Sequence, residues 1–333
     1  MRAKFSVAMC TYNGASFIAE QLATIATQTR PPDELVVCDD GSTDATLECV
    51  REFARTVPFT VRLIPNEKNL GSTKNFERAI ELCEGDFIAL ADQDDVWLPE
   101  KLERLEAALA DQSTVLAFTD GDVVDETLRP TGQRVWQTIR FGAAEQRLFR
   151  RGRAFEVLLD HNVVTGAAMA FKAEFRELIL PIPNDLVHDG IPVLHDWWAA
   201  LLISAVAKVS FIPEPLFKYR QHSAQQLGIM SKYEGNDEPL TTRLRTAASR
   251  RNIFSGEVKY LRAIVERLSS ARAFPLRDGG LADLEPRLTH FETRAAMPPH
   301  RLQRLSPVLR ELVARRYHLY SNGLVSAAKD LWI

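Results

Sequence analysis

The chain has 333 residues, of which 46% are apolar and 26% charged, and its formal net charge is −3. This composition indicates a globular protein that buries a substantial core. The first residues become polar too early for a secretory leader, and the most hydrophobic run, 197–207, is far shorter than the roughly 20 residues of a membrane span. Four single cysteines with no C-x-x-C pair are typical of core residues in a reduced protein. We therefore expect a cytoplasmic protein without a signal peptide or a membrane span.

The first 120 residues alternate between strand and helix patterns. Strands are predicted over residues 5–10, 35–38, 60–64 and 86–91. Helices are predicted over 16–27, 44–54 and 72–82, and from Pro99 onward. Alternation of this kind predicts an α/β fold with a mostly parallel, Rossmann-like sheet flanked by helices.

Polar residues follow three of these strands. The first strand runs into Thr11-Tyr12-Asn13-Gly14, the second into Asp39-Asp40-Gly41-Ser42, and the strand ending at Ala91 into Asp92-Gln93-Asp94-Asp95. The carboxyl ends of parallel strands share one edge of the sheet, where open α/β sheets bind ligands. We therefore expect one cleft that all three segments line.

The acidic segment has two interpretations. Asp92 and Asp94 are two positions apart, so on an extended chain both face the same way and could hold Mg²⁺ or Mn²⁺ between carboxylate oxygens. A solvated acidic turn is the alternative for an isolated D-x-D. The segment taken alone does not decide between them.

After residue 115 the pattern is less regular. A strand is predicted over 115–119, an irregular polar stretch to 153, and a buried strand at the centre of 161–171. A helix begins near 195, and a short extended element covers 211–220. Beyond about 235 only helical patterns occur, with loops around 278–280 and 298–299.

Several nucleotide-binding motifs are missing. The chain has neither G-x-x-x-x-G-K-[ST] nor G-x-G-x-x-G after its first strand. Instead, residues 7–14, 38–44, 69–75 and 85–95 resemble, in order and spacing, the successive motifs of family 2 inverting glycosyltransferases, which have the GT-A fold. Residues 195–198 and 219–222 resemble the subgroup that transfers rhamnose from a dTDP donor. The resemblance extends to about residue 228.

The resemblance implies three regions and a donor site. Residues 1–115 would be the nucleotide-sugar-binding half of the GT-A domain, 116–235 the acceptor-binding half, and 236–333 a helical C-terminal extension. Tyr12 would stack on the pyrimidine of the donor, with Thr11 and Asn13 beside it, and Asp39 would accept a hydrogen bond from the base. Lys74 stands where the family more often has arginine near the base, and it keeps the charge without the planar fork.

The resemblance also assigns the reacting groups. Asp92 would face the ribose, Asp94 would ligate Mn²⁺ or Mg²⁺, and Asp95 would have a supporting role. Asp196, just before a helix, would be the base that takes the proton of the acceptor hydroxyl. His222 would complete the metal ligands.

Each of these residues also has a purely structural interpretation. Asp40 could be a turn or capping residue, Asp196 a helix cap, and His222 a histidine that is hydrogen-bonded locally. His195 and Trp197 are assigned to acceptor binding. One of the two tryptophans at 197 and 198 is expected in the core, while the other could offer an aromatic platform to the acceptor sugar.

The predicted function is metal-dependent transfer of a sugar from a dTDP- or UDP-sugar, with L-rhamnose from dTDP-rhamnose as the best candidate. The acceptor is a hydroxyl of a saccharide or lipid-linked saccharide in bacterial surface polysaccharide synthesis. A catalytically silent nucleotide-sugar-binding subunit and a nucleotidyltransferase are the alternatives. A nucleotidyltransferase should carry a glycine- and arginine-rich phosphate loop near its start, and Thr11-Tyr12-Asn13-Gly14 is not one.

The charge is unevenly distributed. Residues 241–333 contain 17 Lys and Arg against 8 Asp and Glu, a net of +9, which leaves −12 for the first 240 residues. The basic residues could form a solvated helix face, or they could contact anionic lipid on the inner face of the cell membrane. Nucleic acid is not an expected partner, because the acidic first 240 residues would repel its phosphates.

Overall fold

The computed structural model describes residues 2–223, 225, 247–277 and 284–332, and the side chains of 247–253 are not included. The chain divides into two compact units. Unit 1 comprises Met1–Asn184 and Leu194–Lys232, and unit 2 comprises Asp185–Val193 and Tyr233–Ile333. Each unit has its own apolar cluster. None of the described helices is both long and apolar enough to cross a membrane.

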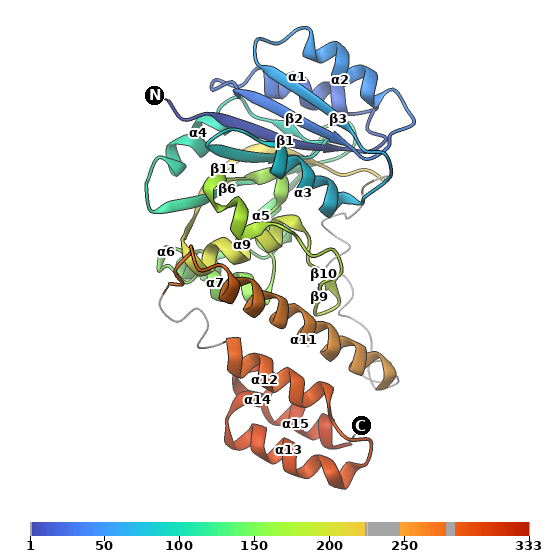
Figure 1. Ribbon diagram of the computed structural model, residues 1–333, viewed down its shortest axis with the longest axis vertical. Coiled ribbons are helices and arrows are strands. Elements are labelled where there is room, and N and C mark those ends of the chain that lie inside the picture. The colour runs from blue at the N-terminus through green and yellow to red at the C-terminus, as the bar shows by residue number, and fades with distance from the viewer. Residues whose placement is uncertain (1, 224, 226–246, 278–283, 333) are drawn as a thin grey trace. The chain divides into compact units, whose positions relative to one another are not determined.

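A nine-stranded sheet forms the centre of unit 1 (Figure 1). Its order is β3-β2-β1-β4-β8-β6-β11-β5, and β7 pairs with β6. β1 pairs in parallel with β2 and β4, β2 with β3, and β6 with β11, whereas β8 runs antiparallel to β4 and β6. The strands are β1 Phe5–Thr11, β2 Glu34–Asp39, β3 Thr60–Pro65, β4 Phe87–Ala91, β5 Val96–Trp97, β6 Thr114–Val124, β7 Pro130–Arg134, β8 Met169–Lys172 and β11 Lys208–Arg220. The predicted α/β fold class is confirmed.

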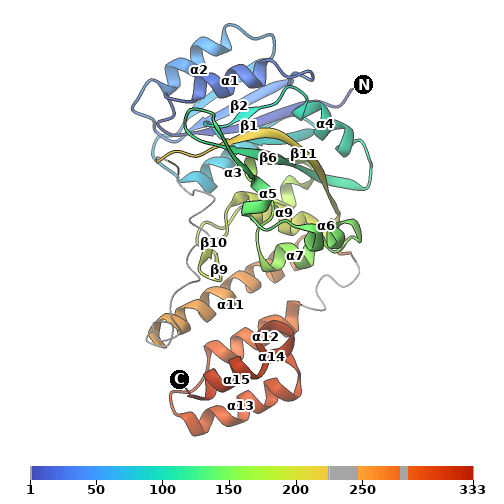
Figure 2. The same ribbon diagram turned by 180° about the vertical axis from the view of Figure 1, so that it is seen from behind.

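Helices cover both faces of the sheet. In Figures 1 and 2, α1 and α2 lie on one face of the β3-β2-β1 part and α3 on the other. β2 and β4 are buried along their whole length because both of their faces are covered. The helices of unit 1 are α1 Ile18–Ala26, α2 Thr46–Ala54, α3 Ser72–Leu82, α4 Lys101–Leu109, α5 Val135–Thr138, α6 Ala143–Arg150, α7 Ala154–Asp160, α8 Arg176–Ile179 and α9 His195–Val206.

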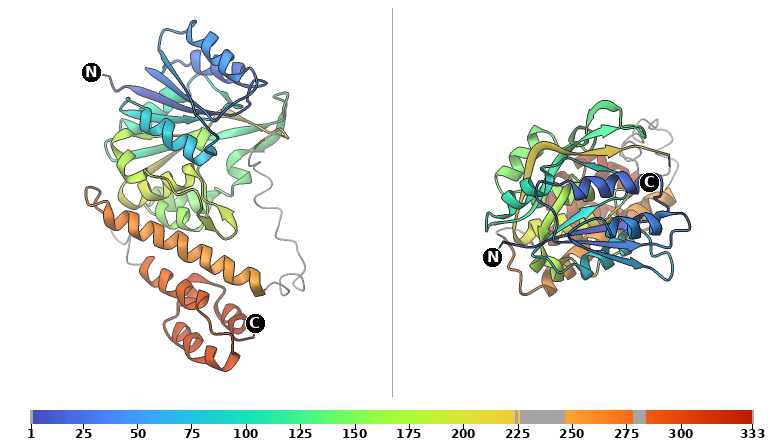
Figure 3. Two further views of the ribbon diagram at one scale, coloured as in Figure 1. Left: turned by 45° about the vertical axis from the view of Figure 1, so that its right-hand side comes forward. Right: turned by 90° about the horizontal axis from the view of Figure 1, so that it is seen from above.

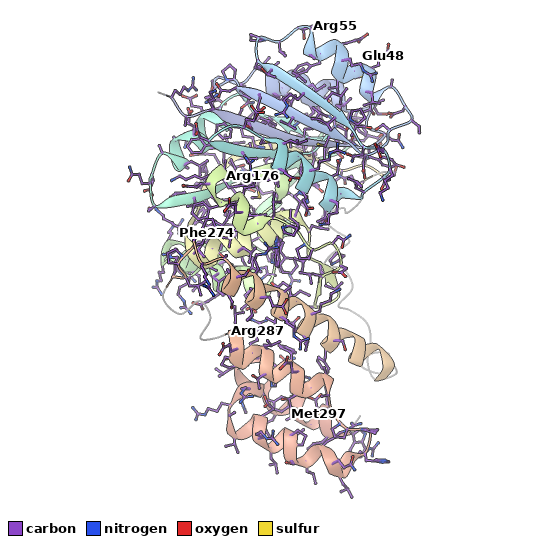
Figure 4. The ribbon with its side chains drawn as sticks, viewed as in Figure 1. Glu48, Arg55, Arg176, Phe274, Arg287 and Met297 are labelled. Carbon is purple, nitrogen blue, oxygen red and sulfur yellow. The ribbon has the colours of Figure 1, made fainter. Side chains whose placement is uncertain are left out.

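Helix α9 lies in the core of unit 1. All of its residues from His195 to Ala205 are buried, which agrees with its nearly continuous apolar sequence. Helix α8 is tied to the end of α3 by Arg176, whose guanidinium donates to the carbonyl oxygens of Glu81 and Cys83 at 3.0 and 2.6 Å (Figure 4).

Two predictions for the second half of unit 1 were wrong. The stretch to residue 153 is not irregular, because it contains the end of β6 together with β7, α5 and α6. The centre of 161–171 is not a strand: the 3₁₀ turn η1 Gly166–Ala168 precedes β8, which begins only at Met169. Gly166 in this turn packs closely on His195, since a Cβ at this position would lie 2.9 Å from Nε2 of His195.

Unit 2 is helical, as predicted, with one short hairpin. Its described helices are α11 Ala247–Ser270, α12 Leu284–Ala295, α13 Arg301–Val313, α14 Arg316–Tyr320 and α15 Gly323–Trp332, and the hairpin is β9 Val187–His188 with β10 Ile191–Pro192. Helix α11 is long and straight (Figure 3). The predicted loop at 298–299 connects α12 to α13, whereas the one at 278–280 lies outside the described residues.

Buried polar pairs hold unit 2 together. His188 of the hairpin lies 2.7 Å from the carboxylate of Glu257 in α11. Arg294 donates to Asp330 at 2.7 Å and joins α12 to α15. Between the last three helices lies a small core to which Met297 adds its side chain (Figure 4). Its other members are Val308, Leu312, Tyr317, Ala327 and Leu331.

Candidate active site

The loops after β1 and β4 are joined by one glutamine. The main-chain N–H of Tyr12 donates to Oε1 of Gln93 at 2.9 Å, and Nε2 of Gln93 donates to the carbonyl oxygen of Tyr12 at 3.0 Å. A Cβ on Gly14 would lie only 2.1 Å from Oε1 of Gln93, so this contact requires glycine. The ring of Tyr12 remains 51% exposed. Two of the three polar strand ends therefore meet, as the sequence predicts, and one aromatic face stays open to a ligand.

The loop after β2 joins the same edge through Asn13. Its main-chain N–H donates to Oγ of Ser42 at 2.8 Å, and its side-chain oxygen accepts from the N–H of Thr43 at 2.9 Å. Asn13 has a positive φ of 46°, which asparagine adopts more readily than most residues. In this structure Asn13 therefore shapes the loop that presents Tyr12.

Asp39 is fully buried and already engaged. Its Oδ1 accepts from the N–H groups of Gly41 and Ser42, at 3.2 and 2.8 Å. Its Oδ2 accepts from the hydroxyls of Thr11 and Ser42, at 2.7 and 2.6 Å. These four donors fill the acceptor positions of the carboxylate. In this conformation Asp39 and Thr11 hold the loop, and neither offers a free group to a base.

The neighbouring Asp40 reaches the segment before α3. Its carboxylate accepts from the N–H groups of Leu70 and Gly71, at 2.7 and 2.9 Å, and from the side chain of Asn66 at 2.9 Å. These contacts agree with the structural interpretation of Asp40, because they join the loop after β2 to the residues just before α3. On α3 itself, Lys74 is paired with Glu77 of the same helix at 2.8 Å.

The two predicted metal ligands meet. Nε2 of His222, after β11, lies 2.9 Å from Oδ2 of Asp94, after β4. The two side chains are only 6% and 16% exposed, and the imidazole packs on the ring of Phe17 with centroids 4.5 Å apart. Arg220 holds the end of β11 next to the loop that carries Asp94, because its Nε donates to the carbonyl oxygen of Asp94 at 2.7 Å. His222 is therefore not a surface histidine.

Four carboxylates gather at this edge. Burial, followed by the charges of Asp94 and Asp196, raises the pKa of Asp92 to about 7. The pKa of Tyr219 is raised by burial and then by the charges of Asp95, Asp92, Asp94 and Asp196. Tyr219 is therefore close enough to all four carboxylates to feel their charges. Its role was not foreseen, although it stands in the same short segment as His222.

The donor set fits a divalent cation. Among the described residues no group of three or more His, Cys, Asp or Glu side chains is arranged to hold a metal. Asp94 and His222, which are hydrogen-bonded to each other, are the two side chains that would hold a divalent cation here. Mg²⁺ is commonly held by one or two protein ligands together with substrate phosphates and water. The surplus of negative charge nearby also favours a cation.

Asp196 is held firmly at the start of α9. Its Oδ1 accepts from the N–H of Trp197 at 2.6 Å, and its Oδ2 accepts from the N–H of Gly166 at 3.1 Å. The N-cap residue of α9 is Leu194, so the capping interpretation of Asp196 is not borne out. A carboxylate near a helix N-terminus is also favoured by the helix dipole.

Lys101 supports the turn that holds Asp196. Its ammonium is fully buried, lies 3.9 Å from the centre of the Trp97 ring, and donates to the carbonyl oxygen of Ala167 in η1. The main-chain N–H of the adjacent Gly166 donates to Asp196. Lys101 therefore helps to position Asp196 indirectly, by holding this turn. The sequence pattern does indicate that Lys101 is buried, because it lies on the same face of α4 as the buried Leu102, Leu105 and Leu109.

Lys101 and the buried carboxylate of Asp95 also influence each other's pKa. Oδ2 of Asp95 finds no hydrogen-bond donor among the described residues, and burial raises the pKa of Asp95 well above its usual range. Burial lowers the pKa of Lys101 to about 7, while the charges of Asp95 and Asp92 oppose this shift. The amine of Lys101 therefore offsets part of the negative charge of Asp95 and Asp92.

The structure gives the two predicted acceptor residues other places. Trp197 is 2% exposed, and its indole N–H donates to the carbonyl oxygen of Leu158 at 2.7 Å. Trp198 is equally buried. His195 is 5% exposed and stacks on Phe76 with ring centroids 3.8 Å apart. We correct both assignments, because side chains packed in the core present no face to an acceptor sugar.

The chain is similar in sequence to known glycosyltransferases. The family described as Glycosyl transferase family 2 matches residues 6–178, more than half of the chain. An uncharacterized protein of Mycobacterium tuberculosis is 26% identical over 225 residues, which are 66% of this chain and 59% of that protein. An uncharacterized glycosyltransferase of Haemophilus influenzae is 25% identical over 233 residues, 70% of this chain and 69% of the relative. A dTDP-rhamnosyl transferase of Shigella flexneri is 37% identical over 99 residues, but these are only 28% of this chain and 34% of the relative.

Solved structures share the fold at low identity. Residues 1–349 of S. aureus TarS align with a TM-score of 0.57 and 19% identity, over 95% of this chain and 91% of that one. The same segment in complex with UDP-GlcNAc gives a TM-score of 0.54 and 16% identity, over 96% and 92%. A mannosyltransferase of Pyrobaculum calidifontis in complex with GDP-Man and Mn²⁺ gives 0.50 and 19%, over 100% and 88%. The predicted GT-A fold is confirmed by these likenesses.

The buried charge of Lys101 yields a stability prediction. Lys101→Met should lower the free energy of unfolding of unit 1 by roughly 3–5 kcal/mol, because it leaves a buried carboxylate without its cation. Adding Asp95→Asn should recover part of that loss. Denaturant unfolding followed by tryptophan fluorescence measures this, since Trp332 is the only one of the five tryptophans in unit 2. Lys172→Met is the control, because this lysine donates only to exposed carbonyl oxygens. Equal stability of the single and double variants would contradict the pairing.

Metal binding tests the Asp94 and His222 pair. If Asp94 and His222 hold the metal, replacing either residue, as Asp94→Asn or His222→Gln, should weaken Mn²⁺ binding roughly tenfold or more, because each substitution removes one of the two proposed ligands. Isothermal titration of the metal into the full chain gives the affinity. Glu52→Gln on the exposed side of α2 should bind Mn²⁺ like the parent chain. If His222→Gln bound equally well, the histidine would not be a ligand.

Proposed function

This chain belongs to glycosyl transferase family 2, and on that basis we propose that it transfers a sugar from a nucleoside diphosphate donor to a hydroxyl of a saccharide acceptor. The observation that carries the proposal is the meeting of Asp94 and His222 at one sheet edge, 2.9 Å apart and among four carboxylates. A cation held there neutralises the diphosphate that leaves when the glycosidic bond breaks.

The donor would lie across the ends of β1 and β4. Tyr12 offers an exposed ring to the base, and Gln93 fixes the main chain on which that ring is carried. Asp92 directly precedes Gln93 in the chain and is assigned to the ribose. UDP-GlcNAc and GDP-Man are the nucleotide sugars in the complexes of the two structural neighbours named above, which supports a donor of this chemical class.

Asp196 is proposed as the general base. Inverting transfer needs one group that takes the proton of the acceptor hydroxyl on the face of the sugar opposite the leaving diphosphate. The two main-chain N–H groups that bond Asp196 hold its carboxylate in one orientation, and its charge lies close enough to raise the pKa of Asp92. Base and donor site are therefore neighbours.

The sugar and the biological setting belong to the proposal as well. L-Rhamnose from dTDP-rhamnose is supported by the partial likeness to the dTDP-rhamnosyl transferase of Shigella flexneri. A role in bacterial polysaccharide synthesis is supported by a further relative, a putative teichuronic acid biosynthesis glycosyltransferase of Bacillus subtilis that is 27% identical over 114 residues, 34% of this chain and 45% of the relative. The cytoplasmic location stays a prediction.

Replacing the proposed base tests the chemistry. Asp196→Asn should lower the rate of transfer at least a hundredfold, in the range of roughly 10²–10⁴ that a general base contributes. Donor binding should persist, because the metal ligands are unchanged. Transfer, donor hydrolysis and pyrophosphate release are measured separately with Mn²⁺, and Glu52→Gln is the control. A fully active Asp196→Asn enzyme would exclude this residue as the base, and pyrophosphate release in place of transfer would indicate a nucleotidyltransferase.

A donor screen tests the ligand class. With Mn²⁺ present, dTDP-rhamnose should raise the unfolding temperature more than UDP-GlcNAc or GDP-mannose, because a ligand that binds only the folded state stabilises it. Tyr12→Ala should weaken donor binding roughly three- to tenfold, as expected for the loss of one stacked ring, and Tyr12→Phe should not. If Tyr12→Ala binds the donor as tightly as Tyr12→Phe does, the ring of Tyr12 does not stack on the base.

A further inference from the structure

Helix α13 carries an apolar face that is open to solvent. Leu302, Leu305, Leu309 and Val313 are 83%, 46%, 57% and 84% exposed. They follow one another at intervals of three, four and four residues, which places them on one side of a helix. We call these four residues the α13 ridge.

The ridge is not the face with which α13 joins its own unit. That face is formed by Val308 and Leu312, which pack in the small core of unit 2, and by Arg304, which donates to the carbonyl oxygens of Pro298 and Pro299. The helix therefore has two apolar faces and uses one of them for folding. Four large apolar side chains exposed in a row are typical of an interaction surface.

The charge around the ridge is one-sided. The segment from 296 to 332 contains six Lys and Arg but only two acidic residues, Glu311 and Asp330. Both carboxylates are turned inward: Glu311 is 1% exposed and bonded to Arg316, and Asp330 is 10% exposed and bonded to Arg294. From α13 to α15, the described residues therefore present no acidic side chain outward.

Exposed cations and a tryptophan complete the surface. Arg301 and Arg310 stand on α13 itself, and both are exposed. The guanidinium of Arg301 lies 5.0 Å from the ring centre of Trp332, which is 72% exposed. A helix with an apolar stripe, flanking arginines and an aromatic neighbour has the composition of helices that lie in the headgroup region of a bilayer.

We propose that the α13 ridge is a membrane-docking surface for anionic lipid. The exposed arginines are attracted to negative headgroups, and the leucines enter the apolar layer below them. A second copy of this chain would bring the same cations face to face. A soluble polyanion would satisfy the arginines but would leave the ridge in water. The proposal goes beyond the glycosyl transfer, and its test needs neither donor nor metal.

Vesicle binding by the full chain tests the proposal. Wild-type protein should co-sediment with vesicles of phosphatidylcholine and phosphatidylglycerol, and much less with phosphatidylcholine alone. The triple variant Leu302→Ser, Leu309→Ser, Val313→Ser should bind the anionic vesicles at least about tenfold more weakly, because it removes most of the inserting surface. Arg301→Gln with Arg310→Gln should also weaken binding and should reduce its dependence on salt.

The matched control changes exposed apolar residues elsewhere in unit 2. Leu319→Ser, Leu324→Ser, Val325→Ser should bind like the wild type, and circular dichroism should show that all variants keep their helices. Failure of the wild type to bind anionic vesicles at low salt overturns the proposal, and so does unchanged binding by the ridge variant. A ridge variant that dissociates a dimer while vesicle binding persists assigns the ridge to a second copy instead.

Discussion

The crowding of carboxylates at one sheet edge is the constraint on which the rest of unit 1 depends. Asp92, Asp94, Asp95 and Asp196 all influence the pKa of one tyrosine, so their charges lie close together at a largely buried place. Like charges in such surroundings repel strongly and each loses hydration. Two basic residues offset part of this charge: Lys101, which donates to Ala167, and Arg220, which donates to the carbonyl oxygen of Asp94. At the proposed site a divalent cation would offset the remaining negative charge, so the same crowding that lowers stability would favour binding of a metal ion.

The polar residues after each strand divide into two groups. Tyr12, Asp92 and Asp94 are partly exposed and can contact a ligand. The carboxylates of Asp39 and Asp40 instead accept hydrogen bonds from neighbouring loops. The second group sets the position of the first, because a loop held by buried hydrogen bonds has few other conformations. Each strand-end motif therefore contains residues that can contact a ligand and residues that hold the loop in position.

Unit 2 stands outside the residues that the family model matches. Its helix α13 has two apolar sides: one packs inside the unit, and the other is exposed. Val308 and Leu312 satisfy the small core, while the α13 ridge remains in solvent among arginines. The inward orientation of Glu311 and Asp330 produces the outward positive charge as much as the number of arginines does.

Local pattern and long-range packing account for different parts of this protein. The sequence by itself determined the strand and helix alternation of the first 110 residues, the shared edge and the acidic segment, because each follows from neighbours along the chain. Only the tertiary structure brought His222 to Asp94 across 128 positions, placed Lys101 under the turn at Ala167, and buried Trp197 and His195. Burial depends on which elements pack together, and a single sequence does not state those partners. The order of motifs thus predicted the kind of site, and packing decided which of its residues face a ligand.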